Sequence, residues 1–162
     1  MGDWTHFDEH GLPRMVDIAG KAESHRVARA VATVEMLPAT LEAIEKGHVK
    51  KGDVFGVATT AGVLAAKQSA FLIPMCHPIR LTRVSLNFQP QEDKRGVFIE
   101  AIVEAFDRTG VEIEALVAAS IAALTVIDMC KALDRTMSVR SVLLKEKLGG
   151  RSGHFLRQDA PE

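Results

Sequence analysis

The stretch from Leu81 to Asp134, LTRVSLNFQPQEDKRGVFIEAIVEAFDRTGVEIEALVAASIAALTVIDMCKALD, decides the fold. Residues 81–88 alternate apolar and polar side chains, the pattern of a half-buried strand, and residues 97–106 are a second extended run. The loop QPQEDKRG between them indicates a hairpin. After the turn residues 107–110, we expect one long helix over residues 111–134.

Upstream of this stretch, residues 25–36 alternate loosely and predict a strand, with a helix as the competing interpretation. A short helix is expected after Pro38, and Asp53 can cap a longer one from Val54 to about Ala70. Residues 137–145 predict a last strand. This order predicts an α+β protein, a ferredoxin-like β-α-β-β-α-β sandwich whose antiparallel sheet carries its helices on one face.

The length of 162 residues fits one domain over residues 1–162, with a mobile N-terminal arm (about 1–24) and a C-terminal tail (about 148–162). A hydrophobic content of 47% and a net charge of -1 argue against disorder and against a global nucleic-acid footprint. Aromatic residues are only 5%, which disfavours a stacking platform for single-stranded nucleic acid. We therefore expect no nucleic-acid partner.

The location is expected to be cytoplasmic. The chain starts without the pattern of a signal peptide, and its charge-free stretch Ala115–Ile127 is shorter than the roughly 20 apolar residues that span a bilayer. Membrane insertion is therefore not expected. Cys76 and Cys130 have no CxxC spacing, which fits two free thiols in a reducing compartment.

The long predicted helix points to an assembly of several subunits. It is apolar or small on every face from Ala115 to Ile127, so a partner subunit is expected to cover the side that the sheet does not. Glu112 and Asp128 lie 16 residues apart, or about 24 Å along a straight helix. If both helix ends are functional, each chain has two sites or the pocket is built from two subunits.

Charged residues at the two ends of this helix are candidates for chemistry. Asp128, Lys131 and Arg135 are spaced to share one helix face, either as a solvated ion pair or around a bound anion. Glu112 and Glu114 open the helix, where carboxylates also simply complement the helix dipole.

Cys76 and His77 follow the second predicted helix, in a loop. Their spacing is poor for zinc, so no metal site is predicted; His77 is a candidate general acid or base, or else a buried structural histidine. Local basic groups suit phosphate, although a solvated surface is the default for each one. These groups are Lys50 and Lys51, Lys67, Lys21 with Arg26 and Arg29, and Lys147 with its glycine-rich tail. None has the spacing of a P-loop.

Six segments together are specific for one family. They are RMVDIAGKAESHRVARA (14–30), KGDVFGVATTAGVLAAK (51–67), LIPMCHPIRL (72–81), TGVEIEAL (109–116), AALTVIDMCKALDR (122–135) and KLGGRSG (147–153). In these segments the chain resembles the MoaC family of molybdenum cofactor biosynthesis. It departs from the family pattern mildly, at Met75, Ile113, Ile127 and Arg151.

The resemblance implies a lyase that converts 3',8-cyclo-7,8-dihydroguanosine 5'-triphosphate to cyclic pyranopterin monophosphate and releases pyrophosphate. It also implies a homo-hexamer, a trimer of dimers, with pockets at the dimer interfaces. No cofactor is required, and Mg²⁺ is allowed as a companion of the triphosphate. The implied catalytic residues are Lys51, Asp128 and Lys131. The implied substrate-binding residues are Met75, Cys76, His77, Glu112, Ile113, Glu114, Lys21, Arg26, Lys67 and Lys147.

Two other functions fit the composition without the resemblance. One is a non-catalytic ferredoxin-like module that binds a nucleotide or assembles with another protein. The other is a nucleotide phosphohydrolase that uses a carboxylate-bound Mg²⁺ and releases inorganic phosphate from GTP.

Overall fold

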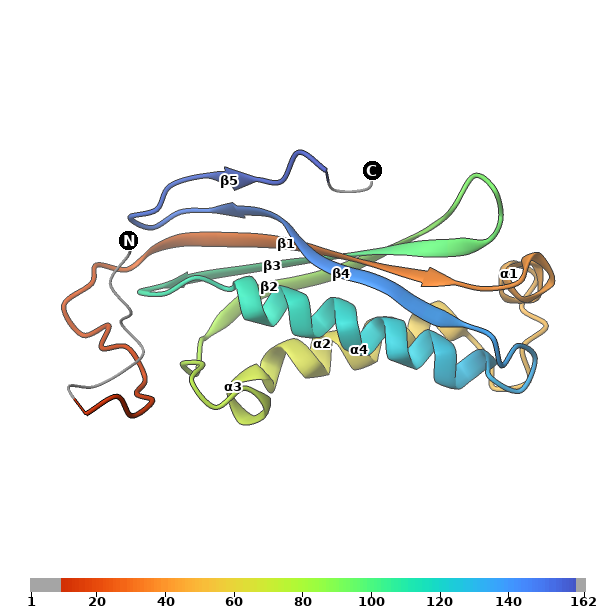
Figure 1. Cartoon of the computed structure of the whole chain (residues 1–162), viewed down its shortest axis with the longest axis horizontal. Helices are drawn as coiled ribbons and strands as arrows, with labels where there is room; N and C mark the ends of the chain where they lie inside the picture. Colours follow the sequence, from red (N-terminus) through yellow and green to blue (C-terminus); the bar gives the residue numbers. More distant parts are fainter. Residues whose placement is uncertain (1–9, 160–162) are drawn as a thin grey trace.

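Five antiparallel strands form one sheet in the order β2-β3-β1-β4-β5 (Figure 1). The computed structural model describes residues 10–159. Its elements are β1 (Ser24–Glu35), α1 (Pro38–Glu45), α2 (Val54–Lys67), α3 (Ser69–Leu72), β2 (Leu81–Pro90), β3 (Gly96–Asp107), α4 (Glu112–Cys130), β4 (Ser138–Leu148) and β5 (Phe155–Leu156).

Helices α2 and α4 cover one face of this sheet, which confirms the predicted ferredoxin-like sandwich (Figure 1). The strand over residues 25–36 is real, so the competing helix there is wrong. Asp53 caps α2 as expected, because its carboxylate accepts a hydrogen bond from the backbone N–H of Gly56 at 3.0 Å.

The core between sheet and helices is rich in alanine, so the layers approach closely. Gly62 in α2 has no room for a side chain. A Cβ at this position would lie 2.6 Å from Leu86 and 3.0 Å from the Ala118 carbonyl oxygen. Eleven alanines of the core are fully buried: Ala28, Ala30, Ala32, Ala58, Ala101, Ala105, Ala115, Ala118, Ala119, Ala122 and Ala123.

Helix α4 ends at Cys130, four residues before the predicted end at Asp134. The reason is a contact with α1: Oδ2 of Asp134 accepts hydrogen bonds from the Leu37 backbone N–H at 2.8 Å and the Thr40 hydroxyl at 3.2 Å. The Asp134 carboxylate therefore supplies a hydrogen-bond acceptor for the N-terminal end of α1. Arg135 lies beyond the helix, so it does not share a helix face with Asp128, and that part of the prediction is wrong.

By length and composition, α4 could cross a membrane, but half of it is buried inside the protein. Core helices of soluble proteins pass the same test, and here α4 packs on the sheet (Figure 1).

The C-terminal tail contains a short strand that the sequence pattern did not predict. Leu156 of β5 lies opposite Glu146 of β4, and the Arg157 backbone N–H donates to the Lys145 carbonyl at 2.9 Å. The mobility of the arm and tail stays a prediction. Residues 1–9 of the arm and 160–162 of the tail lie outside the described residues.

Candidate active site

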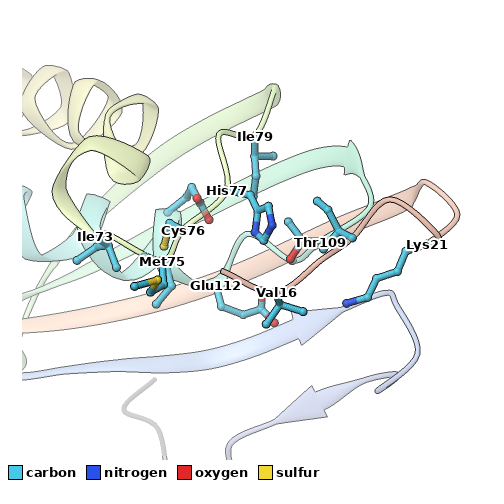
Figure 2. A pocket seen from close by; sticks show the side chains of 13 residues that line it. Val16, Lys21, Ile73, Met75, Cys76, His77, Ile79, Thr109 and Glu112 are labelled. Atoms are coloured by element: carbon cyan, nitrogen blue, oxygen red, sulfur yellow. The ribbon is translucent and has the colours of Figure 1, made fainter. Parts of the chain in front are cut away.

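A pocket of about 500 Å³ opens at the N-terminal end of α4. After α3 the chain forms a turn, which is closed by a hydrogen bond from the Cys76 backbone N–H to the Ile73 carbonyl at 3.0 Å. This turn carries residues 75–77 to the first turn of α4 (Figure 2). The pocket brings together seven of the predicted substrate-binding residues: Lys21, Met75, Cys76, His77, Glu112, Ile113 and Glu114. We call it the ring pocket.

Glu114 is unusual in the ring pocket because it is an ionisable residue that is only 4% exposed to solvent. Burial, with a smaller contribution from the charge of Glu112, raises the pKa of its carboxyl to about 7, although a hydrogen bond from its own backbone N–H works in the opposite direction. Burial, and then the charge of Glu114, raise the pKa of the Cys76 thiol. The pocket therefore holds a protonated thiol beside a carboxyl that exchanges its proton near neutral pH.

A second pocket, of about 690 Å³, adjoins the first and is cationic. The two pockets share four lining residues, Lys21, Thr109, Gly110 and Glu112. The second pocket holds the predicted residues Arg26 and Lys147, and we call it the cationic pocket. The Arg26 guanidinium is fixed there, because its Nε donates to the Asp107 carbonyl and its Nη2 to the Arg108 carbonyl, each at 3.2 Å. Lys147 Nζ donates to the Ser152 hydroxyl.

The three predicted catalytic residues meet at the other end of α4. Oδ1 of Asp128 lies 2.7 Å from Lys131 Nζ, and its Oδ2 lies 2.9 Å from Lys51 Nζ. Lys51 Nζ also donates to the Asp128 carbonyl at 2.8 Å. Hydrogen bonds from Lys131 and then Lys51 lower the pKa of Asp128 to about 2. The carboxylate is therefore ionised at neutral pH and holds two ammonium groups together.

In one chain, these residues form two separate sites. Glu112 and Asp128 lie on one continuous helix, about 24 Å apart along its axis. Lys67 does not line either pocket and is not part of the cluster of Lys51, Asp128 and Lys131. It lies exposed at the end of α2. Within residues 10–159, no three His, Cys, Asp or Glu side chains gather as a metal site.

The sequence matches the family model described as the MoaC family over residues 15–150. The chain belongs to the MoaC family. Its MoaC relatives include a protein of Desulfitobacterium hafniense that is named cyclic pyranopterin monophosphate synthase. The two are 54% identical over 155 residues, which cover 96% of this chain and 94% of the relative.

Two further relatives carry the same name. The protein of Thermomicrobium roseum is 51% identical over 159 residues, or 98% of this chain and 96% of its own length. That of Magnetococcus marinus is 54% identical over 157 residues, or 97% and 96%. The MoaC resemblance of the six segments is confirmed.

Sequence reasoning missed several residues of this candidate site. Thr109 lines both pockets and Arg108 the cationic one, yet residues 107–110 were interpreted only as a turn. Thr109 opens the segment TGVEIEAL, which was the one available signal. The pairing of Lys51 with Asp128 was also missed, since 77 residues separate them in the chain.

Proposed function

We propose that the chain is a cyclic pyranopterin monophosphate synthase of molybdenum cofactor biosynthesis. As a lyase, it converts 3',8-cyclo-7,8-dihydroguanosine 5'-triphosphate to cyclic pyranopterin monophosphate and pyrophosphate. Membership of the MoaC family and the names of its relatives support this activity. The observation that carries it is the union of an apolar ring pocket with a cationic pocket, since a nucleotide triphosphate has the same two parts.

In the proposed binding mode, the purine-derived rings lie in the ring pocket against Met75, Cys76, His77 and Ile113. The carboxyl of Glu114 holds the amidine edge of the guanine by paired hydrogen bonds, next to Glu112.

The triphosphate extends into the cationic pocket. Its proposed contacts are Lys21, Arg26 and Lys147, with Lys67 added by the family resemblance. Three of these four side chains line that pocket, which supports the assignment.

The chemistry is assigned to Lys51, Asp128 and Lys131. Rearranging a purine to a pterin requires several proton transfers, and hence more than one acid–base group. Because the pKa of Asp128 is about 2, its carboxylate is not a proton donor at neutral pH. The two ammonium groups that it holds are the proton donors in this proposal, and they also stabilise developing negative charge.

The working unit in this proposal is a homo-hexamer, a trimer of dimers, in which each active site combines residues of two subunits. The separation of about 24 Å along α4 supports a shared site, because one chain cannot bring both helix ends to one substrate. Exposed apolar side chains on the outer helical surface, Val57, Leu64 and Leu124, offer a surface for a partner.

The enzyme is a cytoplasmic single domain over residues 1–162 that requires no cofactor, with Mg²⁺ accompanying the triphosphate. Activity assays with EDTA and with added Mg²⁺ test the metal requirement. Rates that differ by less than about twofold support a metal-independent reaction, and a loss that only Mg²⁺ restores refutes it.

The decisive experiment incubates the purified chain with the cyclised GTP and, separately, with GTP. We expect a pterin product and pyrophosphate from the cyclised substrate alone. A non-catalytic module would consume neither compound. A phosphohydrolase would release inorganic phosphate from GTP in the presence of Mg²⁺.

A further inference from the structure

Arg108 lies in the cationic pocket, and neither the sequence pattern nor the family resemblance assigned it a role. It follows the last residue of β3. Its Nη1 donates to the Ala19 carbonyl at 3.1 Å, and its Nε lies 3.9 Å from the Glu23 carboxylate. The side chain therefore reaches from the turn after β3 to the arm, and it remains 43% exposed to solvent. A guanidinium in this position faces the same space as Lys21 and Lys147.

Arg26 holds the turn that carries Arg108. Its two hydrogen bonds end on the carbonyls of Asp107 and Arg108, so a residue of β1 ties down the backbone after β3. Two of its donor groups are thus engaged by the protein itself. This geometry positions the turn as well as supplying charge.

Gly150 makes room for the Arg26 guanidinium. Its φ of +76° lies in the left-handed region, and a Cβ there would lie 1.8 Å from Nη1 of Arg26. Any side chain at this position would push the guanidinium away. Gly153 in the same loop has a similar φ of +65°, but a Cβ there would meet nothing within 4 Å.

We propose that Arg108 is a further polyphosphate-binding residue of this site, and that Arg26 and Gly150 position it. The proposal rests on the proposed function and deepens it. Arg108 adds its positive charge to those of Lys21, Arg26 and Lys147, opposite a single carboxylate, Glu112, among the lining residues of the cationic pocket. Its planar fork of donors suits two phosphate oxygens at once.

Calorimetric titration with inorganic tripolyphosphate tests Arg108 apart from turnover. We expect Arg108→Ala to raise the Kd about tenfold, a typical loss for one hydrogen bond to a charged group. Arg140→Ala is the matched control, because Arg140 is also a charged arginine, 70% exposed and paired with Glu35 at 3.4 Å. Glu35 lies nine residues along β1 from Arg26, about 30 Å away. The control should change the Kd by less than about twofold.

Salt separates a phosphate contact from a purely structural role for Arg108. The difference between wild type and Arg108→Ala should shrink as ionic strength rises, since exposed charges are screened beyond about 8 Å at 0.15 M. A Kd equal to that of the wild type, or a difference independent of salt, overturns the proposal. So does a wild type that fails to bind tripolyphosphate.

The pair Gly150→Ala and Gly153→Ala tests the positioning role. Both changes place a Cβ at a positive φ, so both should lower the melting temperature by a similar amount. Only Gly150→Ala should weaken tripolyphosphate binding, because only its methyl group displaces Arg26. If Arg26 acts through Arg108, this loss should be smaller in the Arg108→Ala background. Equal weakening in both variants would reject the positioning role. Turnover of the cyclised GTP by the wild type is measured separately, and its absence rejects the proposed function without altering these binding comparisons.

Discussion

Asp128 lies between two ammonium groups, so at the scale of one residue it controls the geometry of the proposed catalytic group. Asp128→Asn keeps the size of the side chain but removes the charge that holds Lys51 and Lys131. We expect kcat to fall at least about 100-fold, a typical contribution of positioned acid–base groups. The melting temperature should barely change, because the side chain is 56% exposed and exposed ion pairs stabilise little.

The matched control for this change is Asp53→Asn, which alters a carboxylate that caps α2 and for which no catalytic role is proposed. Asparagine is also a good N-cap, so this control should keep both activity and stability. A large loss of melting temperature in Asp128→Asn, with activity regained on stabilisation, would make Asp128 a structural residue instead.

Glu114 should make stability depend on pH. Its pKa of about 7 in the folded protein lies above the ordinary 4.5, so between these values the folded chain keeps a proton that the unfolded chain has lost. The stability that this proton supplies is complete below pH 4.5 and is lost as the pH rises through about 7.

Glu114→Gln stays neutral and lacks this dependence. The melting temperature of the wild type minus that of the variant should therefore fall from about pH 5 to about pH 8. Glu112→Gln serves as the comparison on the same helical turn. A difference that stays flat for Glu114→Gln would show that its carboxyl has an ordinary pKa.

At the scale of elements, Asp134 joins the chain after α4 to the start of α1. The residue is 2% exposed, and its Oδ1 also accepts hydrogen bonds from the Thr136 backbone N–H at 2.9 Å and hydroxyl at 2.6 Å. Asp134→Ala leaves the Leu37 N–H without this acceptor and should cost about 1 to 3 kcal/mol of unfolding free energy. Urea denaturation measures this loss.

The control is Asp93→Ala, whose carboxylate accepts from the Arg95 N–H at 3.0 Å on an exposed loop and should matter little. Burial raises the pKa of Asp134, but the hydrogen bonds from Leu37, Thr136 and Thr40 outweigh it, so the net pKa is lowered below 3.8. The stabilisation is therefore present above pH 3.8 and lost as the pH falls further. Equal losses for both variants would mean that Asp134 does not join the two elements.

Periodicity predicted most elements of the fold, because each strand or long helix carries its pattern within its own residues. The end of α4 could not be predicted, since Asp134 leaves the helical region to bind a backbone N–H 97 residues away. Nor could β5, because two residues carry no period and are held only by pairing with β4.

In the candidate site, too, contacts within one helix could be predicted from the sequence, whereas contacts between distant segments could not. Spacing of three residues on a helix placed Lys131 beside Asp128, as found. The contact of Lys51 with Asp128, and the bonds of Arg26 to the turn after β3, join distant segments and became visible only in the folded chain.

At the scale of the whole molecule, the two ends of α4 predict complementation between subunits. If one active site takes Lys131 from one subunit and Glu114 from its partner, a mixed dimer of Lys131→Ala and Glu114→Ala has one doubly altered and one intact site. Mixing the two inactive proteins should then restore up to about half of the wild-type activity per mixed dimer.

Differently tagged chains verify that subunits exchange. No recovery after verified exchange would reject the shared site. Mixing Lys131→Ala with Asp128→Asn is the control, since both lesions lie at the same helix end and each site of that mixed dimer stays altered.

The alanine core packs α4 on the sheet at a low cost in side-chain entropy. Alanine has no side-chain rotamers, so burying Ala115, Ala119 and Ala122 loses almost no side-chain entropy, whereas each leucine or isoleucine would lose about 0.5 to 1 kcal/mol. Because these side chains are small, the backbone of α4 comes close to its neighbours: the Ala118 carbonyl oxygen would lie 3.0 Å from a Cβ at Gly62. The separation of about 24 Å between Glu112 and Asp128 is therefore set by the helix backbone, which packs directly on the sheet.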